Sequence, residues 1–169
     1  MCCKLLITLF TVLLSNIVLA QELKLMLPIG HTVSLTTAEF SPDGNMIATA
    51  SADGVVKIWQ ASSGSLITNI KGHKDWVNTV QFSPNGKKVV TASMDSSAKI
   101  WDPASGSLLA DLIGHTQGVY TAEFSPDGKK IVTASWDNTA KIWDVSSGTL
   151  LADLKGHTRG VYNAEFSPD

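Results

Sequence analysis

Apolar and polar residues alternate along short segments of this chain, and turn residues separate the segments. Between Gly114 and Lys155 this pattern predicts four strands. They run from Val119 to Phe124, Ile131 to Ser135, Ala140 to Trp143 and Leu150 to Leu154, and are joined by Ser125-Pro126-Asp127-Gly128, Asp137-Asn138 and Ser146-Ser147-Gly148. The first connection suits a type I turn, because proline fixes φ at its second position and glycine accepts a positive φ at its fourth. The block is therefore predicted to be a four-stranded antiparallel meander.

The same block recurs along the chain with a period of 42 residues. A Gly-His dipeptide marks each copy, at Gly30-His31, Gly72-His73, Gly114-His115 and Gly156-His157. One block of this size cannot bury enough apolar surface to fold alone. Neighbouring copies must therefore cover both faces of each sheet, as they do in a radial propeller or a stacked array.

A Trp-Asp dipeptide ends the predicted third strand at Trp101-Asp102 and Trp143-Asp144, whereas the first copy ends in Trp59-Gln60. Together with the Gly-His dipeptides, these motifs resemble the WD-repeat β-propellers, and the resemblance covers Leu23 to Asp169. It implies an all-β, WD40-type propeller of four-stranded antiparallel blades, as an incomplete ring with three full blades and partial ones. The expected repeats span residues 30–71, 72–113 and 114–155, and residues 156–169 are expected to begin a fourth with its first strand.

Residues 21–29 precede the first complete copy. Aligned on the Gly-His dipeptide, they take the place of a fourth strand that lacks its first three. In closed WD-repeat propellers such a strand often completes the last blade and so closes the ring, which removes exposed sheet edges. By that resemblance the partner strands lie beyond Asp169, and the chain is expected to be the N-terminal part of a longer propeller.

A histidine, a serine, an aspartate and a tryptophan recur at matching positions in each complete copy. They are His31, Ser51, Asp53, Trp59, His73, Ser93, Asp95, Trp101, His115, Ser135, Asp137 and Trp143. A Ser-His-Asp set suggests a hydrolase triad, but one triad in an open cleft suffices for catalysis, and three copies favour a structural role. The resemblance implies a buried hydrogen-bonded chain that ties the loop before strand one to strands two and three. We expect no catalytic residue and no cofactor here. We also expect no metal site, because histidines on successive blades stand too far apart for metal–ligand bonds of about 2 Å.

The first 20 residues differ from the repeat. Lys4 precedes an apolar run from Leu5 to Ala20, and Val18-Leu19-Ala20 has the small-residue spacing of a signal peptidase site. We expect residues 1–20 to be a signal peptide and the protein to be exported, to the periplasm or the extracellular space. The alternative is an uncleaved membrane anchor, although the run is shorter than the roughly 20 residues that a spanning helix needs. Cys2 and Cys3 precede the apolar run, so we interpret them as incidental.

Charge and cysteine content exclude several classes of function. Removal of the first 20 residues leaves no cysteine, hence no disulfide, thiol nucleophile or thiolate metal site. The net charge is −2 and the lysines are scattered, so no nucleic-acid partner and, after cleavage, no membrane span is expected. Export combined with such regular repeats favours, by analogy, a bacterial-type protein.

The loops carry most of the differences between the copies. In WD-repeat proteins the loop after Gly-His and the turn between strands two and three build the exposed face near the central channel. The residues that map there are Trp76, Asn78, Met94, Tyr120, Trp136, Arg159 and Tyr162. Aromatic, methionine and arginine side chains are the types that anchor interfaces. We therefore expect this loop face to bind a partner, the alternative being that these side chains only cover the ends of the strands.

The leading hypothesis is a non-catalytic scaffold that binds another protein or a peptide through its loop face. A second hypothesis makes the propeller the recognition arm of an enzyme, such as a caspase-like peptidase or a kinase, whose catalytic domain lies further along the chain. A third is a carbohydrate- or envelope-binding propeller, which aromatic loops and export also suit.

Overall fold

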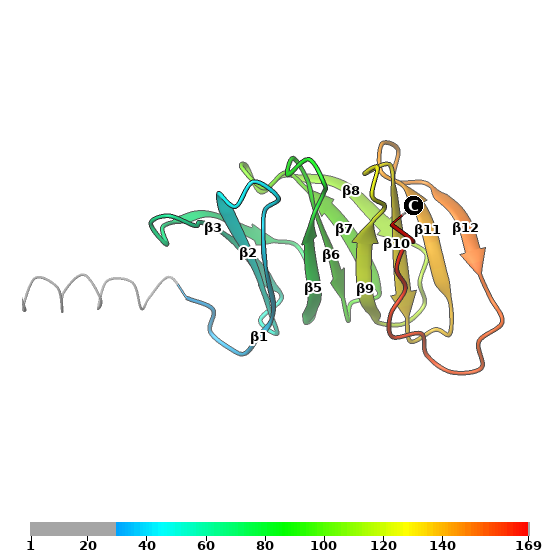
Figure 1. Ribbon diagram of the computed structural model, residues 1–169. Helices are drawn as coiled ribbons and strands as arrows, with labels where there is room; N and C mark the ends of the chain where they lie inside the picture. Colours follow the sequence, from blue (N-terminus) through cyan, green and yellow to red (C-terminus); the bar gives the residue numbers. More distant parts are fainter. Residues whose placement is uncertain (1–29, 169) are drawn as a thin grey trace, which may run out of the picture. The chain divides into compact units, whose positions relative to one another are not determined.

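Twelve strands form three separate sheets in the computed structural model, which describes residues 30–168 (Figure 1). The first sheet contains β1 (Leu35–Phe40), β2 (Met46–Ser51), β3 (Val55–Gln60) and β4 (Leu66–Lys71); the second contains β5 (Val77–Phe82), β6 (Val89–Ser93), β7 (Ser97–Trp101) and β8 (Leu108–Ile113); the third contains β9 (Val119–Phe124), β10 (Lys130–Ser135), β11 (Ala140–Asp144) and β12 (Leu150–Leu154). In each sheet the strands pair antiparallel in chain order. The predicted all-β fold of four-stranded meanders is confirmed.

The predicted turns also have the expected geometry. Gly128 donates its N–H to the carbonyl of Ser125 at 2.8 Å and has a φ of +69°. The hydroxyl of Ser125 donates to Asp127 at 2.6 Å and accepts the N–H of Lys130 at 2.9 Å. This turn, whose counterparts in the other sheets contain Gly44 and Gly86, fixes the register of the first two strands.

Three predicted segments are not confirmed. Residues 161–166 repeat the pattern of β9 but form no strand, because no second strand lies beside them among residues 30–168. No first strand of a fourth blade is thus formed among these residues, and the predicted start of a fourth repeat at residues 156–169 stays a prediction. The expected signal peptide (1–20) and orphan strand (21–29) lie outside the described residues.

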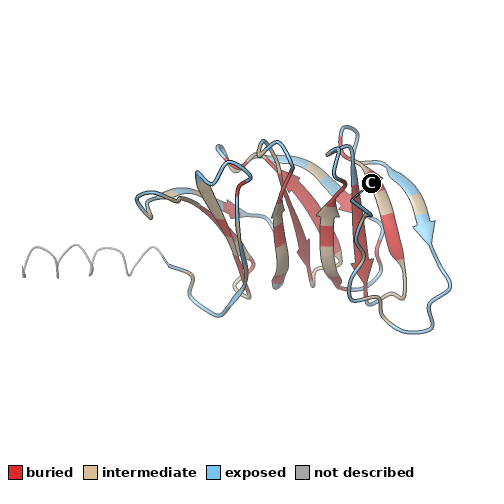
Figure 2. Ribbon diagram, viewed as in Figure 1, coloured by how far each residue is buried: buried red, intermediate tan, exposed pale blue. Residues whose placement is uncertain are grey.

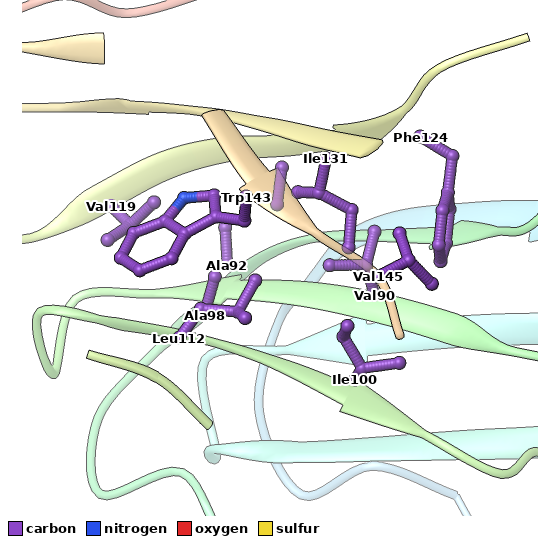
Figure 3. Close-up of a cluster of buried hydrophobic side chains, with 11 residues drawn as sticks. Val90, Ala92, Ala98, Ile100, Leu112, Val119, Phe124, Ile131, Trp143 and Val145 are labelled. Carbon is purple, nitrogen blue, oxygen red and sulfur yellow. The ribbon is translucent and has the colours of Figure 1, made fainter. Parts of the chain in front are cut away.

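The hydrophobic core consists of two clusters, one between each pair of neighbouring sheets. The first combines Ile58 and Ile70 of the first sheet with Val77, Phe82 and Trp101 of the second. The second is shown in Figure 3 and combines Val90, Ala92, Ala98, Ile100 and Leu112 of the second sheet with Val119, Phe124, Ile131, Trp143 and Val145 of the third. Burial is accordingly deepest on the middle strands, whereas β12 is mostly exposed (Figure 2). The side chains of the strands thus pack between the sheets, so residues that could contact a partner are expected on the loops.

A lysine on the third strand of each sheet is also buried. The ammonium of Lys141 lies 2.8 Å from Asp153 on β12, and that of Lys99 lies 2.5 Å from Asp111 on β8. In the first sheet Lys57 instead donates to the amide oxygen of Asn69 at 2.8 Å. Each pair joins the third strand to the fourth and satisfies a charge that burial would otherwise penalise.

Ser96, in the turn between β6 and β7, has a φ of +69°, in the left-handed region that glycine adopts without strain. The equivalent residue of the first sheet is Gly54. We predict that Ser96→Gly raises the free energy of unfolding by about 0.5 to 1 kcal/mol, because relief of the backbone strain outweighs the added entropy of the unfolded chain. Urea denaturation measures the change.

Asn138 occupies the matching turn of the third sheet with a φ of +68° and provides the control. Asparagine tolerates this conformation better than serine does, so Asn138→Gly should stabilise less than Ser96→Gly. A loss of stability in Ser96→Gly would show that strain at this turn is negligible.

Candidate functional site

Each sheet contains a buried chain of hydrogen bonds that crosses it from the third strand to the loop before the first. In the third sheet the indole Nε1 of Trp143 lies 2.9 Å from Oγ1 of Thr133. The same Oγ1 lies 2.7 Å from Nε2 of His115, whose Nδ1 is 2.8 Å from Oδ2 of Asp137. A carboxylate only accepts hydrogen bonds, so Nδ1 carries the proton and Nε2 accepts from the threonine hydroxyl. The donors therefore run in one direction, from tryptophan to aspartate.

The other two sheets repeat this chain. In the second sheet Trp101 and His73 lie 2.9 and 2.6 Å from the hydroxyl of Thr91, and His73 lies 2.8 Å from Asp95. In the first sheet Thr49 connects Trp59 and His31 in the same way, at 2.9 Å to each, but the distance from His31 to Asp53 lengthens to 3.3 Å. The aspartates also fasten the loop, since Asp137 accepts the N–H of Thr116 at 3.0 Å.

The serine of each predicted set does not lie between tryptophan and histidine. The hydroxyl of Ser135 instead donates to the carbonyls of Gln117 and Gly118, and it accepts the N–H of Asp137 at 3.1 Å. Ser51 and Ser93 have equivalent contacts. The residue that sequence reasoning missed is the threonine two positions earlier, Thr49, Thr91 or Thr133, which recurs at the same period.

These contacts also decide the question of a triad. Both ring nitrogens of His115 are occupied, by Thr133 and by Asp137, and Ser135 points its hydroxyl at backbone carbonyls. A triad needs the serine hydroxyl on the histidine in an accessible cleft. The recurring Ser, His and Asp are therefore not arranged as a nucleophile, a base and its orienting acid.

The same contacts set the protonation states of the aspartate and the histidine in this hydrogen-bonded chain. Burial opposes ionisation of Asp137, but hydrogen bonds from Thr139, the N–H of Thr116 and His115 outweigh it and hold its pKa at about 2. Burial lowers the pKa of His115, against the opposing effect of Asp137, so the imidazole is neutral at pH 7. The chain is therefore built for an ionised aspartate beside a neutral histidine.

We predict that acid destabilises the fold most steeply between about pH 4 and pH 2. A depressed carboxyl pKa adds stability that is present above the unfolded value near 3.9 and lost as the pH falls through the folded value. Asp137, with a folded pKa of about 2, and Asp95, also depressed against the effect of burial by bonds from His73 and Ser97, act in this sense. Thermal unfolding followed at a series of pH values measures the effect.

The matched variant Asp137→Asn should be less stable than the parent at pH 7 and should lose less stability between pH 4 and pH 2. Glu39 acts in the opposite sense at higher pH, because burial raises its pKa to about 7 and favours the protonated form in the folded state. The comparison is therefore made below pH 4. Equal acid slopes in both proteins would contradict the role given to Asp137.

Three of the predicted partner-binding residues form an aromatic cluster, made of Tyr120, Trp136 and Tyr162. The rings of Tyr120 and Trp136 meet edge to face with centroids 5.7 Å apart, and those of Tyr120 and Tyr162 lie 4.7 Å apart. The indole Nε1 of Trp136 lies 3.3 Å from the hydroxyl of Tyr162. Trp136 is 45% exposed and Tyr162 is 61% exposed. The cluster thus joins the start of β9, the turn after β10 and the loop at 157–162 on one face.

The remaining candidates are not members of this cluster. Trp76 is 57% exposed, and its carbonyl accepts the N–H of Met94. Arg159 is also exposed. The amide of Asn78 donates to the carbonyl of Val119 at 2.8 Å and so links β5 to β9.

A large side chain in the turn of one sheet packs against a glycine in the loop that leads into the next repeat. A Cβ at Gly118 would lie 2.8 Å from the sulfur of Met94, and one at Gly160 would collide with the ring of Trp136. Met94 therefore covers the following loop and contributes to packing. Trp136 does so as well, and its ring can approach that loop closely because Gly160 has no side chain.

Residues 30–168 contain no group of three or more His, Cys, Asp or Glu side chains placed to hold a metal ion. Within the same residues no helix is long and apolar enough to cross a membrane.

Three antiparallel four-stranded sheets, stacked through their faces and each crossed by the same hydrogen-bonded chain, define a repeat protein of the propeller-blade class. The sequence profile described as "WD domain, G-beta repeat" matches residues 22–60, 64–102 and 106–144, which is more than half of the chain. The chain therefore belongs to the WD-repeat family. The second and third matches begin just before β4 and β8, the fourth strands of the preceding sheets, so the profile's repeats are offset from the structural ones.

Individual relatives match short stretches. The chain is 43% identical over 44 residues to a WD repeat-containing protein of Nostoc sp., which covers 26% of the chain and 3% of that protein. It is 54% identical over 33 residues to a periodic tryptophan protein 2 homolog of Caenorhabditis elegans, covering 20% and 4%, and 46% identical over 43 residues to the bovine proteasomal ATPase-associated factor 1, covering 25% and 11%. The chain thus spans a small part of the length of these relatives.

Proposed function

We propose that the described repeats form a scaffold that binds a protein or peptide through the loop face carrying the aromatic cluster. The observation that carries this proposal is the exposure of Trp136 and Tyr162, together with the separate Trp76, in a fold whose other tryptophans pack against neighbouring strands. Exposed aromatic rings offer a large contact area at low entropic cost and are enriched in interface hot spots. Membership of the WD-repeat family, whose domains generally bind proteins, supports the same function.

Selection of peptides from a displayed library on the immobilised 169-residue chain tests this proposal. The selected peptides should bind Tyr162→Ala and Trp76→Ala about tenfold more weakly than the parent, as expected for hot-spot residues. Lys129→Ala is the matched control, because its exposed side chain follows the turn at the opposite end of β9. Equal binding to all four proteins, or failure to select any peptide, would refute a binding surface at the loop face.

We also propose that the protein is exported after cleavage behind Ala20. The apolar run from Leu5 to Ala20 and the small-residue site before Gln21 support this. Mass spectrometry of the protein expressed in a secreting bacterial host should give a mature chain that begins at Gln21. Recovery of the intact chain in the cytoplasmic fraction would contradict export, and recovery of the intact chain in the membrane fraction would favour an anchor.

A further inference from the structure

The first strands of the three sheets lie side by side and share one surface, made of β1, β5 and β9 and called here the inner surface. Polar side chains join these strands: Thr36 donates to the carbonyl of Val77 at 2.6 Å, and the side chain of Gln81 accepts the N–H of Phe124 at 2.7 Å. A cavity of about 170 Å³ opens between the three strands, lined by Thr37, Glu39, Thr79, Val80, Gln81, Thr121, Ala122 and Glu123. The inner surface is thus polar and hollowed.

The charge of this surface has one sign. Glu39 and Glu123 face the cavity, and Glu165 follows at the equivalent position of the next copy. Neither β1, β5 and β9 nor residues 161–166 contain a lysine or an arginine, and none of the three glutamates forms an ion pair within residues 30–168. Burial, followed by the charge of Glu165, raises the pKa of Glu123. An added cation would relieve the repulsion between Glu123 and Glu165, which is the smaller of these two causes.

The aromatic cluster adjoins the same surface. Tyr120 lies on β9, three residues before Glu123, and Tyr162 has the same spacing from Glu165. Three residues of extended strand span about 10 Å, which is about one Debye length at 0.1 M salt, so the carboxylates act on a cation at the rings when the salt concentration is low. A tyrosine or tryptophan face attracts a cation through its ring quadrupole. Rings and carboxylates therefore favour the same kind of ligand.

We propose that the aromatic cluster is a docking site for a basic peptide segment, which places a lysine or arginine side chain against Tyr120, Trp136 and Tyr162. The proposal rests on the peptide-binding function above and specifies its partner. A metal ion is the wrong cation, since no group of three ligating side chains exists among residues 30–168. A neutral apolar segment would contact the rings but leave the carboxylates without a counter-charge. A basic segment is complementary to both the rings and the carboxylates. Such complementarity orients the bound peptide and speeds its association, in addition to raising affinity.

Fluorescence polarisation on the 169-residue chain tests this directly. The probes are four fluorescein-labelled dodecapeptide pools with identical neutral flanks, whose two central residues are both Lys, Arg, Gln or Glu. The Lys and Arg pools should bind about tenfold more tightly than the Gln pool, and the Glu pool should bind most weakly. The advantage of the basic pools should shrink as salt is raised.

Variants separate the cation effect from simple apolar contact. Tyr162→Leu keeps an apolar side chain without a ring and should weaken the Lys and Arg pools about five-fold while leaving the Gln pool unchanged, whereas Tyr162→Phe should retain binding. Glu123→Gln should reduce the salt dependence. Arg159→Ala, which removes a like charge from the loop before Tyr162, should strengthen binding. Circular dichroism checks that each exposed-site variant remains folded.

The outcomes distinguish the two proposals. If the Gln pool binds as tightly as the basic pools, or if Tyr162→Leu leaves the basic pools unchanged, the basic partner is wrong while the peptide-binding surface stands. If no pool binds and the displayed library also yields no loop-face ligand, both proposals fail.

Discussion

Trp143→Ala is expected to lower the free energy of unfolding by about 4 kcal/mol. The indole is 1% exposed and belongs to the core between the second and third sheets, where it packs among residues of both (Figure 3). It also reaches the loop before β9, since a Cβ at Gly114 would lie 3.0 Å from the ring. Its removal leaves a cavity that the packed sheets cannot close. It also removes the hydrogen-bond donor to the hydroxyl of Thr133.

Tryptophans elsewhere in the chain serve as controls for this prediction. Trp101, which is 2% exposed at the equivalent position, should cost about as much when replaced by alanine. Trp136→Ala, at an exposed position, should cost less than about 1 kcal/mol. Guanidinium denaturation with linear extrapolation measures all three. A loss for Trp136→Ala as large as for Trp143→Ala would mean that burial between sheets does not decide the energetics.

Much of this fold could be predicted because the same pattern of strand and turn residues recurs in every copy of the repeat. Any one copy has short strands whose ends are uncertain, but the turn at Asp127-Gly128 recurs every 42 residues and fixes where strands begin and end. The predicted strands Val119–Phe124 and Leu150–Leu154 match the structure. Residues 161–166 have the same pattern yet form no strand, because a strand needs a hydrogen-bonded neighbour that local sequence cannot supply.

Side-chain contacts were harder to predict. Thr133 and Ser135 are both hydroxyl residues, recur with the same period and lie two positions apart on β10, so they point to the same face of the sheet. Pattern alone cannot decide which of them meets the tryptophan. The resemblance pointed to the serine, and the distances identify the threonine. Likewise the loop positions of Tyr120 and Tyr162 were predictable, but their ring contact depends on packing between segments remote in sequence.

Thr133→Val should cost about 3 kcal/mol, although valine has nearly the same shape as threonine. The hydroxyl of Thr133 is fully buried, accepts from Nε1 of Trp143 and donates to Nε2 of His115. Valine leaves a buried donor and a buried acceptor without partners, and each such group costs about 1 to 3 kcal/mol. Thr133→Ser restores the hydroxyl and should recover most of the loss. Urea denaturation at pH 7 measures these differences.

Thr121→Val supplies a control with the opposite expectation. The hydroxyl of Thr121 is buried but has no hydrogen-bond partner within the described residues, and it lines the cavity of the inner surface. Replacing it by a methyl group removes an unsatisfied polar atom, so the variant should be as stable as the parent or more stable by up to about 1 kcal/mol. The two substitutions change the same atoms in opposite contexts. If they cost the same, the directional chain from Trp143 through Thr133 and His115 to Asp137 contributes nothing beyond shape; if only Thr133→Val is costly, the hydrogen bonds themselves hold each blade to its loop.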